Sequence, residues 1–190
     1  SHNYSDNYSN SYIWRVKKMK KIVIVGAGYA GILTAKKLAK KFKNKEEVSI
    51  KIIDRNSYHT MLTELHEVAA SRVDEDSIKI NLSKVFARRN VEVVMDDISS
   101  IDFEGKKVVG ANDQYEYDYL VMASGSKPTY FGIKGAAENA FNLWSFDDAI
   151  LLKERIENSF RQAAVQSNIE KRKKMLTSYV VGAGLTAAET

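Results

Sequence analysis

Three glycines at positions 26, 28 and 31, spaced G-x-G-x-x-G, follow the apolar run Ile-Val-Ile-Val at 22–25. A strand that passes through such glycines into a helix can hold the pyrophosphate of a dinucleotide. Gly26 permits the tight turn, Gly28 lets the phosphates approach the backbone, and Gly31 lets the strand and helix pack closely. The helix start then offers free N–H groups and a positive dipole end to the phosphates.

A second strand and a helix supply the setting that this motif requires. Residues 48–53 alternate and then run apolar up to Asp54, which lies at about the 20-residue spacing where a carboxylate accepts hydrogen bonds from the adenosine ribose. Between the strands, apolar side chains recur at helical spacing: Ile32, Leu33, Ala35, Leu38, Ala39 and Phe42. The glycine motif alone is a weak signal, but a β-α-β unit ending in an acid predicts a dinucleotide site.

The composition limits the class of protein. The 190 residues include no cysteine, which excludes disulfides, cysteine-ligated metals and a cysteine nucleophile from this stretch and fits a cytoplasmic protein. The net charge of +5 comes from lysine and arginine clusters at 15–21, 36–45 and 171–174. Solvated helix faces and loops explain these clusters, and attraction to an anionic membrane surface is the alternative. There is no nucleic-acid-binding motif, and no apolar run is long enough to span a membrane.

The loop after Asp54 contains further candidates. Residues 56–61 read as a polar loop that leads into a short helix with Leu62 and later apolar residues on one side. His59 is either a hydrogen-bonded loop histidine or a residue near a cofactor, and its distance from His66 does not indicate a metal site. The hydroxyls of Thr60 and Thr63 could reach a cofactor or cap the helix.

The central region predicts more strands. Residues 91–98 read as a strand, and residues 102–117 with their Gly105 turn read as an antiparallel meander. Residues 117–126 read as a buried strand that ends in small residues, as close approach of a ligand to the end of a strand demands. The alternative is a plain left-handed turn at Gly125.

The carboxy-terminal region repeats the strand and glycine motif found at the start of the chain. A capping box of Ser145 and Asp148 begins a long helix, which we expect the basic run 171–174 to end. A strand over 176–181 then leads into Gly182 and Gly184, with Ala187 at the third glycine position. We expect a tail at 1–18 that is disordered or processed, with Met19 as a natural start, a first domain at 19–144, and at 145–190 a linking helix and the beginning of a second dinucleotide-binding domain. The 190 residues read as a piece of a longer protein.

These motifs together resemble the two-dinucleotide-binding-domain flavoproteins, and most closely the type II NADH dehydrogenases, which are single-subunit NADH:quinone oxidoreductases. The resemblance covers nearly everything from Met19 onward. The runs that carry it are VGAGYAG at 25–31, NSYHTMLTELHEVAA at 56–70, ASGS at 123–126, FGIKG at 131–135, SFDDAILLKERIENSF at 145–160 and VGAGLTAAE at 181–189. It implies an α/β fold: a Rossmann-like FAD-binding domain with a parallel sheet and an antiparallel β-meander, cut at the start of an NADH-binding domain.

The resemblance also implies roles for individual residues. The FAD pyrophosphate would be wrapped by the first motif, with Asp54 on the ribose, Arg55 beside it and the backbone of Ile98 at the adenine. The full set implied to bind FAD or NADH is Gly26, Ala27, Gly28, Tyr29, Ala30, Gly31, Asp54, Arg55, Thr60, Leu62, Thr63, Ile98, Ala123, Ser124, Gly125, Gly182 and Gly184. Glu189 matches the family glutamate at the nicotinamide and quinone side, and is the implied catalytic residue.

The implied activity of the parent protein is hydride transfer from NADH to FAD, followed by electron transfer to a quinone or another acceptor. Further implications are peripheral association with the cytoplasmic face of the membrane through the C-terminal part of the family, and a homodimer. Ser124 in place of threonine and Ala187-Ala188 after Thr186 depart from the family pattern. The alternatives are a redox sensor or interaction protein that uses FAD and NADH, and a flavoprotein reductase with a different acceptor; a disulfide reductase lacks its cysteines here.

Overall fold

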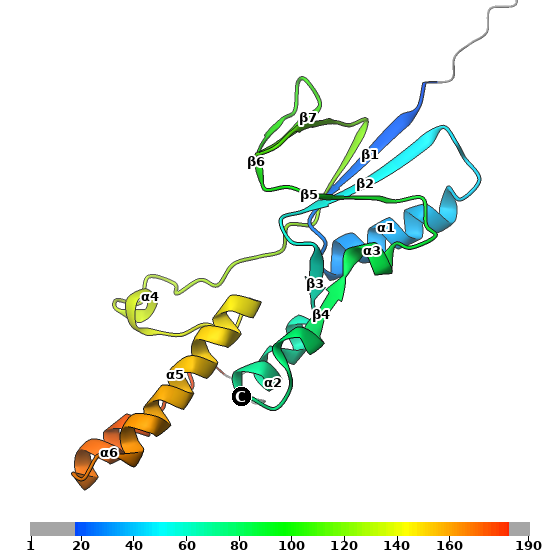
Figure 1. Ribbon diagram of the computed structural model, residues 1–190. Helices are drawn as coiled ribbons and strands as arrows, with labels where there is room; N and C mark the ends of the chain where they lie inside the picture. The colour runs from blue at the N-terminus through cyan, green and yellow to red at the C-terminus, as the bar shows by residue number, and fades with distance from the viewer. Residues whose placement is uncertain (1–17, 183–190) are drawn as a thin grey trace, which may run out of the picture.

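A four-stranded parallel sheet forms the centre of the computed structural model, which describes residues 18–182 (Figure 1). The strand order is β5-β2-β1-β9, so the two strands of the predicted β-α-β unit lie side by side in the middle. The bounds are β1 (Lys20–Val25), β2 (Val48–Asp54), β5 (Glu92–Met95) and β9 (Tyr119–Met122), with α1 (Tyr29–Lys41) connecting β1 to β2. The predicted α/β fold with a parallel sheet is confirmed.

Alternation along β1 places its side chains in two different cores. Ile22 and Ile24 face α1, where they pack with Ala35 and with Phe86 beyond α3 (Leu82–Val85). Val23 and Val25 point to the opposite face and pack against the meander. Because side chains alternate between the faces of a strand, a continuous apolar run indicates a strand covered on both sides. Figure 1 shows α1 and α3 on one side of the sheet and β6 and β7 on the other.

The meander consists of three antiparallel strands in the order β6-β7-β8. These are β6 (Ile98–Asp102), β7 (Lys107–Gly110) and β8 (Gln114–Glu116). The predicted meander is therefore confirmed, and the strand expected over 91–98 ends at Met95 before β6 begins.

A smaller helical part lies beyond the carboxyl ends of the strands. The ribbon of β3 (Tyr58–Thr60) and β4 (Lys79–Asn81) leads to it, through α2 (Leu65–Ala69) and the short 3-10 turns η1 (Leu62–Glu64) and η2 (Glu75–Ile78). There α2 packs on α5 (Phe146–Ala164) through a core that contains Leu65, Val68 and Ala149. The remaining helices are α4 (Ala136–Asn139) and α6 (Ile169–Met175). No helix within residues 18–182 has the length and apolarity needed to span a membrane.

Four expectations about these elements are wrong. Residues 56–61 are not all loop, because 58–60 pair with β4. The long helix ends at Ala164 rather than at the basic run, since Asn168 accepts a hydrogen bond from the backbone N–H of Lys171 and caps a separate helix, α6. Residues 177–182 form no strand, because nothing in residues 18–182 pairs with them. Finally, β9 is half-exposed rather than buried, since β1 is its sole neighbour among the described strands.

Candidate functional site

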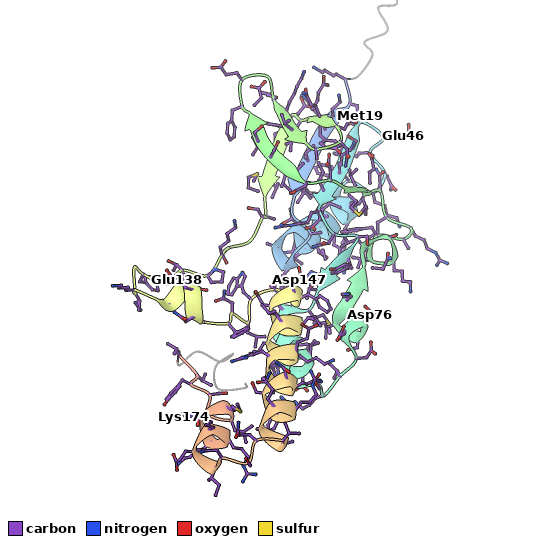
Figure 2. The ribbon with its side chains drawn as sticks, turned by 60° about the vertical axis from the view of Figure 1, so that its left-hand side comes forward. Met19, Glu46, Asp76, Glu138, Asp147 and Lys174 are labelled. Atoms are coloured by element: carbon purple, nitrogen blue, oxygen red, sulfur yellow. The ribbon has the colours of Figure 1, made fainter. Side chains whose placement is uncertain are left out.

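The glycine turn lies at the carboxyl edge of the sheet, where β1, β2, β5 and β9 all end. Gly26 has φ +101°, a conformation that L side chains rarely adopt, and a Cβ there would overlap the carbonyl of Ala123. A Cβ at Gly31 would overlap the carbonyl of Gly26, so α1 can approach β1 this closely only with glycine at that position. The fold itself therefore requires Gly26 and Gly31. Met19 and Glu46, labelled in Figure 2, mark the opposite, amino-terminal edge.

Gly28 differs from both, because nothing in the described structure requires glycine there. Its backbone is extended, with φ −74° and ψ −171°, which any residue can adopt. A Cβ at Gly28 would meet no atom within 4 Å. The absence of a side chain at this position leaves open space directly in front of the helix start.

The first turn of α1 leaves its N–H groups free to face that space. Gly28 is the N-cap without a side-chain cap, and the first turn contains no acidic residue. The first intrahelical bond runs from the N–H of Ile32 to the carbonyl of Gly28, and the N–H groups of residues 28–31 have no partner within residues 18–182. Uncapped N–H groups and the helix dipole favour an anion at this position.

Asp54 lies beside the turn and holds it. Its carboxylate accepts one hydrogen bond from the backbone N–H of Ala27 at 2.7 Å and another from that of Asn56 at 2.9 Å. Each carboxylate oxygen can accept more than one hydrogen bond, so acceptor capacity for a ribose hydroxyl remains. Arg55, the next residue, is exposed.

His59 contacts the same turn from β3. The residue is 7% exposed, and its Nδ1 lies 3.1 Å from the carbonyl oxygen of Ala27. It also meets the ring of Tyr29 edge-on, with centroids 4.6 Å apart and planes at 82°. His59 therefore makes the hydrogen bond that one of its two alternatives expects, although from a strand rather than from a loop, and a role near a cofactor stays a prediction.

Asp96, directly after β5, is a buried carboxylate that the sequence analysis missed. It is 3% exposed and accepts hydrogen bonds from the Tyr115 hydroxyl at 2.7 Å, from backbone and side-chain N–H groups of Asn112, and from the backbone N–H groups of Asp97 and Asp113. The hydrogen bond from Tyr115 holds the pKa of Asp96 below its ordinary value, and burial raises the pKa of Tyr115 to about 12. The strand expected over 91–98 contained Asp96, whereas an end at Met95 would have placed this acid directly after a strand, as the expected strand over 48–53 placed Asp54.

The remaining predicted residues lie at various distances from the turn. Ala123 abuts Gly26 and Gly31, and its N–H donates to the carbonyl of Val25. Ser124 and Gly125 follow at the exposed end of β9, while Ile98 begins β6, two residues after Asp96. Thr60, Leu62 and Thr63 continue from β3 towards α2 and form no hydrogen bond with the glycine turn within the described chain. Neither threonine caps a helix: the N-caps of η1 and α2 are Met61 and Glu64, without side-chain hydrogen bonds.

The second glycine motif lies mostly outside the described residues. Gly182 has φ +126°, the same left-handed region as Gly26 in the first motif. Gly184 and Glu189 lie outside the described residues.

A family of known proteins matches the region that contains this glycine turn. The profile of the family described as pyridine nucleotide-disulphide oxidoreductase matches residues 20–190. The chain belongs to this family. The matched region contains both glycine motifs.

Within the pyridine nucleotide-disulphide oxidoreductase family, the chain is similar to type II NADH:quinone oxidoreductases. It is 38% identical to the type II NADH:quinone oxidoreductase Ndh of Mycobacterium tuberculosis over 174 residues, which cover 89% of this chain and 36% of the relative. It is 35% identical to the type II NADH:quinone oxidoreductase of Staphylococcus haemolyticus, covering 90% of this chain and 42% of that protein. The structure of NDH2 from Plasmodium falciparum shares the fold, with a TM-score of 0.78 at 23% identity over 90% of this chain and 36% of that one. The chain thus spans well under half the length of these relatives.

Proposed function

We propose that this chain is the FAD-binding part of a flavoprotein that oxidises NADH and reduces a quinone. The observation that carries the proposal is Gly28: the described structure has no need for glycine there, whereas a pyrophosphate against the backbone would need one. Uncapped N–H groups in front of it and the acceptor Asp54 beside it fit the two polar parts of an adenine dinucleotide. The names of the relatives favour NADH and quinone as substrates.

The proposed division of labour assigns each residue a binding task. Gly26 to Gly31, with Ala27, Tyr29 and Ala30 between them, would surround the pyrophosphate, Asp54 and Arg55 would hold the ribose, and the Ile98 backbone would meet the adenine. The residues proposed near the flavin ring are Thr60, Leu62, Thr63, Ala123, Ser124 and Gly125. Gly182 and Gly184 would begin the NADH site of a second domain at 145–190, and Glu189 would handle a proton there.

When bound, FAD supplies the ring that accepts a hydride and releases electrons to an acceptor. The task of the protein is to bind and orient it: the α1 N-terminus balances the charge of the phosphates, and Gly26 and Gly31 keep the turn closed around them. For the whole protein we propose a peripheral place on the cytoplasmic face of the membrane, and a homodimer, as in the family that it resembles.

The proposal is tested by titrating the protein with FAD and comparing Gly28→Val. Because a side chain at this position meets open space, the variant should lose at most about 1 kcal/mol of stability through the poorer N-cap. Its FAD affinity should fall by about 100-fold or more, which corresponds to about 3 kcal/mol.

Gly31→Ala is the matched control, since its Cβ overlaps the Gly26 carbonyl and should lower the melting temperature of the protein without FAD. Wild-type protein that does not bind FAD, or a Gly28→Val variant that binds it with unchanged affinity, would contradict the proposal.

A further inference from the structure

The Ala27 residue of the glycine turn is held on both sides by side chains from other strands. The carboxylate of Asp54 accepts from its N–H at 2.7 Å, and Nδ1 of His59 lies 3.1 Å from its carbonyl oxygen. A carbonyl oxygen can only accept, so Nδ1 of His59 carries the proton and donates it. Ala27 itself is 2% exposed, and its hydrogen bond with His59 is buried.

The hydrogen bond from His59 also determines where the next N–H points. The carbonyl of Ala27 and the N–H of Gly28 belong to one planar trans peptide, in which the two groups point in opposite directions. Anchoring the carbonyl oxygen towards His59 therefore directs the Gly28 N–H away from the protein interior. That N–H has no partner within residues 18–182, and the space beside Gly28 is open.

We propose that His59 is a positioning residue for the dinucleotide: its Nδ1–H aims the peptide between Ala27 and Gly28 so that the Gly28 N–H is ready to bind phosphate. This rests on the proposed FAD site. Because the turn is held in place before binding, the cofactor does not have to order this peptide, and a preorganised donor gives tighter binding than a mobile one. The Tyr29 ring, edge-on to His59, keeps the imidazole oriented.

Three His59 variants separate this role from simple packing. In His59→Asn the amide nitrogen takes the place of Nδ1 and preserves the donor, in His59→Gln the amide reaches past it, and His59→Phe keeps the ring contact with Tyr29 but has no donor. FAD affinity, measured by calorimetry, should stay within about 3-fold of wild type for Asn and fall by about 10-fold or more for Gln and Phe, a loss of at least one hydrogen bond.

A second readout requires no cofactor. Amide hydrogen exchange at Ala27, whose N–H donates to Asp54, should accelerate in the protein without FAD in the Gln and Phe variants but not in Asn, because a turn that has lost the anchor on its carbonyl side opens more often. Packing alone predicts the reverse order for affinity, with Phe nearest to wild type.

The outcomes separate the two proposals. If wild-type protein binds no FAD, the proposed function fails, while the Ala27 exchange rates still test the anchor. If the wild type binds FAD and all three variants bind it equally well, or if Asn loses as much as Gln, then the positioning role is overturned. Should Phe fail to fold, the Asn and Gln pair still decides between the two roles.

Discussion

At the scale of single residues, a charged hydrogen-bonding centre joins the meander to the sheet. Asp96 follows the edge strand β5, and its backbone N–H donates to the carbonyl of Asp54, so it extends the sheet edge that carries the candidate site. Its carboxylate collects donors from the loop between β7 and β8, and a Cβ at Gly110 would overlap it. Tyr115 completes the set from β8. A buried carboxylate is tolerable only when its oxygens are satisfied in this way.

This centre makes the stability of the protein sensitive to pH on both sides. Because the folded-state pKa of Asp96 lies below 3.8, its carboxylate contributes stability above that value, and the contribution is lost as the pH falls through the folded pKa. The pKa of Tyr115 is raised from 10.0 to about 12, so its contribution is complete below pH 10 and is lost as the pH rises towards 12.

Tyr115→Phe tests the hydrogen bond between the two residues and the alkaline effect. At neutral pH the free energy of unfolding should fall by about 1.5–3 kcal/mol, the usual range for a hydrogen bond to a charged group. The loss of stability between pH 10 and 12 should become shallower, as measured by urea unfolding at several pH values together with tyrosinate absorbance. Tyr119→Phe is the control, because that side chain is 58% exposed. Equal effects of the two substitutions would rule out the centre as the cause.

At the scale of elements, α5 is stabilised both by a local capping box at its start and by tertiary contacts along its length. The Ser145 hydroxyl accepts from the Asp148 N–H at 3.1 Å, and the Asp148 carboxylate accepts from the Ser145 N–H at 2.9 Å. This confirms the predicted capping box. The apolar side chains along this helix are covered unevenly: Ala149 and Ala163 are buried, whereas Phe160 is 62% exposed. Lys153 and Glu75, 3.0 Å apart, join the helix to the turn before β4.

Removal of the cap should weaken this helix without disturbing the sheet. We expect Ser145→Ala to cost about 1 kcal/mol in free energy of unfolding, the typical loss for a missing N-cap side chain. Ser145→Asp, which keeps a capping oxygen, should cost much less. Denaturant unfolding followed by circular dichroism provides the measurement, and an alanine variant as stable as the wild type would mean that packing on α2 alone holds the helix start.

At the scale of the whole molecule, the described chain is elongated. The ribbon of β3 and β4 joins the parallel sheet to the helical part, which contains α2 and α5 (Figure 1). Figure 2 shows Asp147 at the start of α5, at the end of this helix nearest the sheet, and Lys174 in α6 at the far end of the molecule. Apolar side chains remain exposed over this length, among them Phe131 at 88% and Val181 at 93%. The chain spans 36% and 42% of the two type II relatives compared above, and the division into parts at 19–144 and 145–190 stays a prediction.

The two glycine motifs predict separate tasks: the first binds FAD, and the second serves the oxidation of NADH. Glu189→Gln changes a residue of the second motif, so FAD affinity should stay within about 2-fold of wild type, since less than about 0.4 kcal/mol would then be lost. NADH oxidation by the full-length protein should fall. Flavin titration and an NADH absorbance assay on the same preparation measure the two quantities. A large loss of FAD affinity would contradict the role proposed for Glu189.

The sequence by itself determined the features that depend on neighbours a few residues apart. The glycine spacing, the apolar run of β1, the helix that follows it and the Ser145–Asp148 cap were all predictable, because turn geometry, strand alternation and capping are local. The approach of Asp54 to the turn was predictable as well, since adjacent parallel strands end at the same edge.

Tertiary structure alone decided the rest. Residues 27 and 59 meet only because the separate ribbon of β3 and β4 places His59 beside the turn, and the burial of Asp96 depends on a loop 16 residues away in sequence. The half-exposed state of β9 and the unpaired residues 177–182 follow from which strands lie beside them. A sequence pattern records the preference of a segment for a conformation, whereas burial and pairing depend on partners that a local pattern does not contain.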